Sequence, residues 1–242
     1  SVSLACFAYA GLLKLGEILF GISVQHEAGY ICAMLFIIPG FPFITSGIDL
    51  AKLDMRSGIE RLTYALIVIL VATMSAWIMA LILHLKPVDF IKLSLSTEQW
   101  ILFRLLASFC GVFGFSIMFN SPVRLAVAAA GIGAVANTLR LEHGRPCKYS
   151  SCCSRIYWCT YCGTSGVLLK NKVGYPRISV TVPSIVIMVP GLYLYRGFYN
   201  LGIMSLSVAA SWFASAILII AALPLGLIFA RILTDKAFRY CT

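Results

Sequence analysis

Two proline–glycine pairs, Pro39-Gly40 and Pro190-Gly191, are the residues of this sequence best suited to hold a ligand. Proline removes a backbone donor and collides with the preceding helical turn, and glycine loosens the turn that follows. A helix broken in this way exposes backbone N–H and C=O groups that would otherwise bond to one another. Such groups can hold a small polar molecule, so we expect binding rather than covalent chemistry.

The two pairs lie in segments that match without gaps. Residues 34–50 read MLFIIPGFPFITSGIDL, and residues 185–201 read IVIMVPGLYLYRGFYNL. The alignment superposes the two proline–glycine pairs and places Asp49 on Asn200. A turn with small residues and a long apolar run follow each copy, so the pattern predicts an internal repeat.

A run of cysteines is the second group that could do chemistry. Five of the nine cysteines lie between residues 144 and 166, namely Cys147, Cys152, Cys153, Cys159 and Cys162. A CxxC pair can bind a metal ion or form a redox-active disulfide, but no second pair stands at the spacing of a zinc site. Metal or redox chemistry is therefore the weaker alternative here, and we expect neither a metal site nor a cofactor.

The same segment has another explanation at the level of the gene. If the gene is read one base later, each cysteine codon (TGY) gives a codon that begins with G and a pyrimidine. Such codons encode alanine or valine. Residues 147–166 would then become an apolar stretch of about 20 residues, the length of one membrane span. The sequence of this segment as it stands does not predict a helix. We hypothesise that residues 147–166 are a translated frameshift.

The composition of the chain indicates the kind of secondary structure that holds these residues. The chain has 242 residues, of which 60% are hydrophobic and 12% charged, and its mean hydropathy is +0.93. Soluble domains are about half apolar and about a quarter charged, and disordered chains carry few apolar residues. We therefore expect an all-α, polytopic membrane protein embedded in a lipid bilayer. The net charge of +10 is typical of cytoplasmic loops, and nothing indicates nucleic-acid binding.

Seven apolar runs are predicted to be membrane-spanning helices, because backbone groups in lipid must be satisfied within the segment. The runs are 2–20, 30–48, 62–85, 100–119, 123–139, 180–199 and 206–233. The two proline–glycine pairs interrupt the second and the sixth run. We divide the chain into residues 1–85, the end of a first membrane half, and residues 86–242, a second half that includes 147–166.

Charge placement supports an additional crossing at residues 147–166. Basic residues cluster at 52–61, 170–177 and 231–239, and the positive-inside rule places all three clusters in the cytoplasm. The first two clusters lie on the same side only if 147–166 also crosses. The two broken helices then run in opposite directions, and such an inverted repeat points to a transporter binding site. Two kinked helices without a ligand are the alternative.

Two motifs resemble those of a known family. The residues FIIPGFP, DL and RSGIERL between positions 36 and 62 resemble the Pro-Gly-x-Pro-Leu, Asp-Leu and Ser-Gly-x-x-Arg-Leu signature of the threonine/serine exporter family. The residues YPR, VP, VPG and LYRG between 175 and 197 are similar to that family's second-half signature. The resemblance covers nearly the whole chain.

The resemblance implies ten spans, a cytosolic segment upstream, and proton-driven export of threonine and serine across the cytoplasmic membrane. The chain starts at Ser1 without a basic stretch before its first apolar run, so we expect a fragment whose upstream part is missing. No phosphate-binding loop, nucleophile elbow or HExxH motif is present in the sequence, and we do not expect an enzyme. A non-transporting membrane scaffold or partner subunit, and a channel, are the alternatives to a transporter.

Nine residues are candidate substrate-binding residues. A zwitterionic amino acid needs donors for its carboxylate, which the start of a half-helix supplies, and acceptors for its ammonium group, which freed carbonyls or Asp49 supply. Thr45 could bond to a substrate hydroxyl or instead to its own helix, and Arg196 could bind a carboxylate or extend to the membrane surface. The predicted set is Pro39, Gly40, Pro42, Thr45, Asp49, Pro190, Gly191, Arg196 and Asn200.

Overall fold

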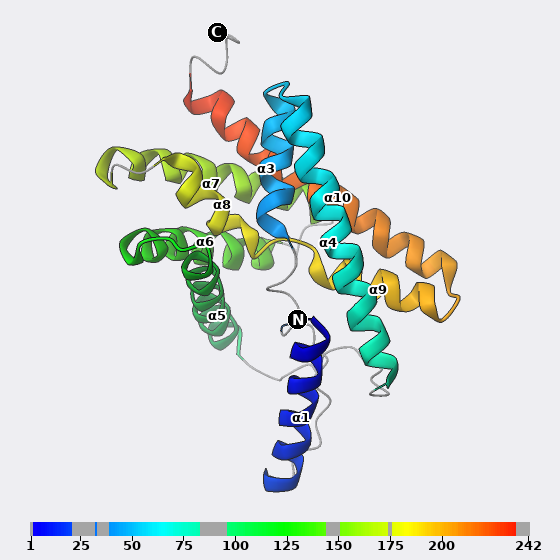
Figure 1. Ribbon diagram of the computed structural model, residues 1–242. Coiled ribbons are helices and arrows are strands. Elements are labelled where there is room, and N and C mark those ends of the chain that lie inside the picture. The colour runs from blue at the N-terminus through cyan, green and yellow to red at the C-terminus, as the bar shows by residue number, and fades with distance from the viewer. Residues whose placement is uncertain are drawn as a thin grey trace. The chain divides into compact units, whose positions relative to one another are not determined.

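Every regular element that the structure describes is an α-helix (Figure 1). The computed structural model describes residues 2–20, 32, 39–82, 96–143, 151–173 and 176–235. The helices are α1 (Val2–Phe20), α3 (Gly40–Ala51), α4 (Met55–Ile82), α5 (Thr97–Met118), α6 (Val123–His143), α7 (Ser151–Val173), α8 (Arg177–Val186), α9 (Gly191–Gly202) and α10 (Leu206–Thr234). The prediction of an all-α chain is confirmed.

Among the described residues, four helices are long and apolar enough to cross a membrane: α4, α5, α6 and α10. Helices α8 and α9 meet the same criteria together as one broken span. These helices confirm a helical, multi-pass membrane protein. The predicted run 30–48 is described continuously only from Pro39 onward, and residues 147–150 lie outside the described part of the chain.

Residues 151–173 form helix α7, so the expectation that this segment has no helix as written is wrong. Trp158, Cys159 and Cys162 are buried on one face, and Gly163 and Gly166 follow at helical spacing. In a protein interior, cysteine acts as a small hydrophobic residue, and this face packs against α6 and α8. Serine, threonine and arginine residues interrupt the apolar residues of this helix, so no apolar run marks it in the sequence. The frameshift itself stays a hypothesis.

The described helices fall into two compact units that interleave along the chain. One unit contains α1, α4 from Thr63 onward, α9 and α10 up to Ile217; the other contains α3, the start of α4, α5 to α8 and the rest of α10. The larger core lies in the second unit. Its buried members are Ile44, Ile48, Ala136, Trp158, Cys159, Cys162, Val182, Ile185, Val186, Met188, Leu223 and Leu227.

The two aligned sequence segments fold into the same local unit, a short helix, a turn and a long helix. Helices α3 and α9 both have 12 residues, and each begins at the glycine of a proline–glycine pair. The following long helices begin at Met55 and Leu206, which are separated by the same number of residues as Gly40 and Gly191. The sequence repeat is therefore also a repeat of secondary structure.

Both short helices end in the same kind of turn. A non-glycine residue after each helix has a positive φ, 63° in the first copy and 62° in the second. The N–H of Asp54 donates to the C=O of Asp49 at 3.1 Å, and the N–H of Ser205 donates to the C=O of Asn200 at 2.9 Å. These bonds close a Schellman motif, which satisfies carbonyls at a helix end. The aligned residues Asp49 and Asn200 thus hold equivalent positions.

Each short helix packs closely on the long helix of the other copy. In one unit, a Cβ atom added to Gly47 of α3 would lie 2.5 Å from Pro224 of α10; in the other unit, a Cβ added to Gly202 of α9 would overlap Trp77 of α4. Small residues allow such close approach of membrane helices. The inverted direction of the two copies stays a prediction.

A partly buried ion pair and a buried polar contact join α5 to α6. The guanidinium of Arg104 donates to the carboxylate of Glu142, and the two side chains are 19% and 25% exposed. The same guanidinium lies 5.3 Å from the centre of the Trp100 ring. Further along the helices, the amide of Asn137 donates to the hydroxyl of Ser108 at 2.8 Å.

The Gly47 contact predicts the effect of one added methyl group. We expect Gly47→Ala to lower the stability by about 1–3 kcal/mol, because the core must shift to accept an overpacked side chain. The matched control is Gly131→Ala in α6, where a Cβ atom meets nothing within 4 Å, and a stabilisation of about 0.5–1 kcal/mol is expected from helix propensity. Thermal unfolding of the detergent-solubilised full chain measures both; equal effects would contradict the close contact.

The Arg104–Glu142 pair predicts a non-additive pair of mutations. Arg104→Leu should cost about 1–3 kcal/mol, because it leaves the carboxylate of Glu142 largely buried without its partner. The double variant Arg104→Leu/Glu142→Leu should recover most of that loss. The control is Arg56→Leu, which removes a pair with Glu60 whose side chains are 92% and 69% exposed and should cost about 0–1 kcal/mol. Additive losses in the double variant would contradict the pairing.

Candidate functional site

The first residue of α3 contacts the residue that precedes the second proline–glycine pair. A Cβ atom added to Gly40 would lie 3.0 Å from a methyl carbon of Val189, and Val189 directly precedes Pro190. Pro39, Gly40, Pro190 and Gly191 are all buried. The start of α3 therefore meets a segment far away in the sequence, the stretch between α8 and α9, and glycine at position 40 leaves room for the contact.

A short non-helical stretch that ends at Pro190 separates α8 from α9. Helix α8 ends at Val186, and the N–H of Val189 donates to the C=O of Val186 at 3.1 Å in the turn that follows. Pro190 has φ −82° and ψ 50°, outside the helical range, and no side chain caps the start of α9. Uncapped amides at a helix start carry partial positive charge and can receive a carboxylate.

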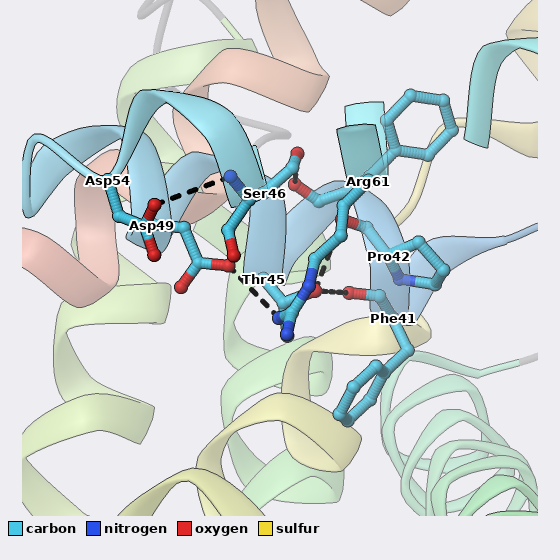
Figure 2. Close-up of polar contacts among 9 residues, drawn as sticks. Phe41, Pro42, Thr45, Ser46, Asp49, Asp54 and Arg61 are labelled. Carbon is cyan, nitrogen blue, oxygen red and sulfur yellow. Dashed lines mark hydrogen bonds and ion pairs between the residues drawn. The ribbon is translucent and has the colours of Figure 1, made fainter. Parts of the chain in front are cut away.

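The opposite end of α3 carries an ion pair with α4 (Figure 2). Oδ2 of Asp49 lies 3.0 Å from Nη1 of Arg61, and the two side chains are 18% and 51% exposed. The nearby carboxylate of Asp54 accepts a hydrogen bond from the N–H of Ser57 at 3.3 Å, which caps the start of α4. Of the two neighbouring carboxylates, Asp49 is the one that links two helices.

Thr45 and Pro42 lie between the two ends of α3. The hydroxyl of Thr45 donates to the C=O of Phe41 at 3.0 Å (Figure 2), so its proton is used within the helix while its oxygen can still accept. Pro42 stands in the first turn, where its missing N–H costs no helical hydrogen bond. The predicted residues of the first copy are thus spread along α3, from its first residue to its last turn.

One amino acid cannot contact all the predicted residues of α3 at once. At 1.5 Å per residue, Gly40 and Asp49 are about 13 Å apart along the helix axis. The structure therefore places Gly40 against Val189 and leaves Asp49 at the far end of α3. Any role of Asp49 must differ from direct contact with a substrate held at Gly40.

The second copy has a cation–π contact where the first has an ion pair. The guanidinium of Arg196 on α9 lies 5.2 Å from the centre of the Trp212 ring on α10, and Tyr193 packs edge-on against the same ring at 5.4 Å. The side chain of Asn200 donates to the C=O of Arg196 at 2.8 Å. Arg196 and Asn200 therefore lie together on α9, one turn apart.

Analysis of the sequence did not identify Arg61 as the partner of Asp49. The available signal was an acidic residue at the end of one short helix and a basic residue in the second turn of the next. Such residues meet only if the intervening turn reverses the chain tightly. The Schellman turn, which contains a positive φ at Leu53, is not evident in the sequence because leucine rarely adopts this conformation.

Comparisons with known proteins identify the family. The family model described as Threonine/Serine exporter, ThrE, matches residues 104–233, which is more than half of the chain. A second threonine/serine exporter model matches residues 1–83. Searches among curated proteins and among solved structures gave no match. Each matched region contains one proline–glycine pair, in the order that the resemblance predicted, and the chain belongs to the threonine/serine exporter family.

Proposed function

We propose that this protein is a secondary transporter that exports threonine and serine across the cytoplasmic membrane in exchange for protons. Membership of an exporter family supports a transport role. The observation that carries the proposal is the contact of Gly40 with Val189, which brings the buried start of α3 against the non-helical stretch between α8 and α9. Irregular backbone in a membrane is tolerated where it lines a cavity or is covered by protein, and transporters place their substrates at such breaks.

The chemistry of the breaks suits a zwitterion. The substrate carboxylate accepts hydrogen bonds from the first amides of the short helices, which carry the positive end of the helix dipole. Carbonyls freed by Pro39 and Pro190 accept from the substrate ammonium group. Both interactions use backbone atoms, so recognition of the amino-acid core needs no charged side chain at the breaks. The proposed site comprises the nine residues predicted from the sequence, with Asp49 acting indirectly.

The Asp49–Arg61 pair is the proposed proton-sensitive element. Protonation of Asp49 removes its charge and weakens the attraction across the 3.0 Å contact that links α3 to α4. The equivalent residue of the second copy, Asn200, carries no charge and cannot respond in this way. The two copies therefore differ chemically at equivalent positions, because a proton can change the charge of Asp49 but not that of Asn200.

Efflux of radiolabelled threonine tests the transport proposal against its alternatives. Cells that express the full chain should lower their internal threonine below the external level, and a protonophore should abolish this uphill efflux. A channel would allow only downhill flux that survives the protonophore, and a scaffold would give no flux above that of empty-vector cells. Either of those results would contradict a proton-coupled exporter.

Asp49→Asn tests the proton-sensitive element. We expect it to reduce uphill threonine efflux about tenfold or more, a change equivalent to about 1.4 kcal/mol. Protein levels should stay normal, because Arg61 is half exposed and tolerates the loss of its partner. The matched control is Asp54→Asn, since asparagine caps a helix as well as aspartate and efflux should change less than about twofold. Intact coupled efflux in Asp49→Asn would contradict this role.

A further inference from the structure

Helix α8 ends at a carbonyl that the second proline–glycine pair leaves without its helical donor. Pro190 has no N–H to offer the C=O of Val186, four residues earlier. That C=O accepts the N–H of Val189 at 3.1 Å, and a carbonyl oxygen has a second lone pair for a ligand. Helix α8 has only 10 residues, too few to span a bilayer alone. The position of this carbonyl therefore depends on the helices against which α8 packs.

The hydroxyl of Ser184 joins α8 to α6. Ser184 is fully buried, and its hydroxyl donates to the C=O of Val180 in its own helix at 2.7 Å and to the C=O of Ala129 on α6 at 3.0 Å. Serine in a helix often bonds back to its own helix, as Ser116 of α5 does with the C=O of Val112 at 2.8 Å. The bond from Ser184 to a second helix therefore fixes α8 relative to α6.

Close packing surrounds this hydrogen bond. A Cβ atom added to Gly133 of α6 would lie 2.7 Å from the carbonyl oxygen of Ser184 and 3.2 Å from its Cα. On α5, a Cβ atom added to Gly111 would lie 3.0 Å from Cδ1 of Ile187, the first residue after α8. Small residues allow helices in a membrane to approach this closely. Helices α5 and α6 therefore hold the end of α8 by its backbone as well as by the hydroxyl of Ser184.

We propose that Ser184 is a positioning residue of the threonine site, which holds the C=O of Val186 where it accepts the substrate ammonium group. Val186 follows Ser184 by two residues in the same helix, so a shift or rotation of α8 moves both. The hydroxyl of Ser184 itself touches no substrate atom. This inference rests on the proposed transport of threonine and serine.

Ser184→Ala removes the bond to α6, and Ser116→Ala is the matched control, because it removes an equally buried hydroxyl that bonds within its own helix. Uptake of threonine into inverted membrane vesicles that contain the full chain, at a fixed proton gradient, gives the KM and the maximal rate. We expect Ser184→Ala to raise the KM about threefold to tenfold, the effect of one buried hydrogen bond. Ser116→Ala should change the KM less than about twofold. Ser184→Cys, which keeps a weak donor, should give an intermediate KM.

Gly133→Ala tests the backbone contact beside the same bond. Its methyl group would displace the backbone of Ser184, so we expect the KM to rise here as well. The control is Gly131→Ala in the same helix, where an added Cβ atom meets nothing within 4 Å, and the KM should not change. Since Ser184→Ala and Gly133→Ala disturb one contact, the double variant should raise the KM by less than the product of the two single increases.

Two results would overturn the role of Ser184. One is an unchanged KM in Ser184→Ala, because a lower maximal rate alone means less active protein and a merely structural serine. The other is an equal rise in KM for Ser184→Ala and Ser116→Ala. Both results leave threonine transport by the unmodified chain, and with it the proposed function, intact. If Ser184→Ala does not accumulate in the membrane, Ser184→Cys and Gly133→Ala decide by the same criteria. An unmodified chain that transports no threonine would refute the proposed function and this inference together.

Discussion

Backbone polar groups inside a membrane must find partners within the protein, and this constraint bears on the ends of α3 and α9 and on the non-helical stretch between α8 and α9. Proline at positions 39 and 190 removes one donor in each copy. Schellman turns at the far ends of α3 and α9 satisfy carbonyls there. Close packing through Gly40 covers the break between α8 and α9 with the start of α3.

The repeat combines equivalent backbone structure with different side-chain chemistry. Both copies have a short helix of 12 residues that ends in the same turn. In the first copy, an ion pair between Asp49 and Arg61 bridges the short and long helices, and in the second, Arg196 packs on Trp212. An ion pair responds to a proton and a contact between arginine and tryptophan does not. The aligned positions 49 and 200 therefore differ in charge although their backbone structure is the same.

Helix α7 contributes buried residues to the core although its sequence contains no long apolar run. Its buried face carries two free thiols, Cys159 and Cys162, and a Cβ atom added to Gly226 of α10 would lie 2.5 Å from the Cβ of Cys159. The hydroxyl of Thr160 also donates to the C=O of Gly226 at 3.0 Å. Small side chains and one polar contact thus hold α7 against α10 without a continuous apolar run.

Hydropathy, proline and glycine act locally along the chain, so the amino-acid sequence was enough to predict the class of the protein, most of the described helices and the two proline–glycine pairs. It also predicted the family through two ordered motifs. Only the tertiary structure decided that Gly40 meets Val189, that Asp49 pairs with Arg61, and that α7 is a helix. Each of these depends on a tight turn or on small residues in a close helix contact, and their positions are set by packing between distant segments rather than by local sequence.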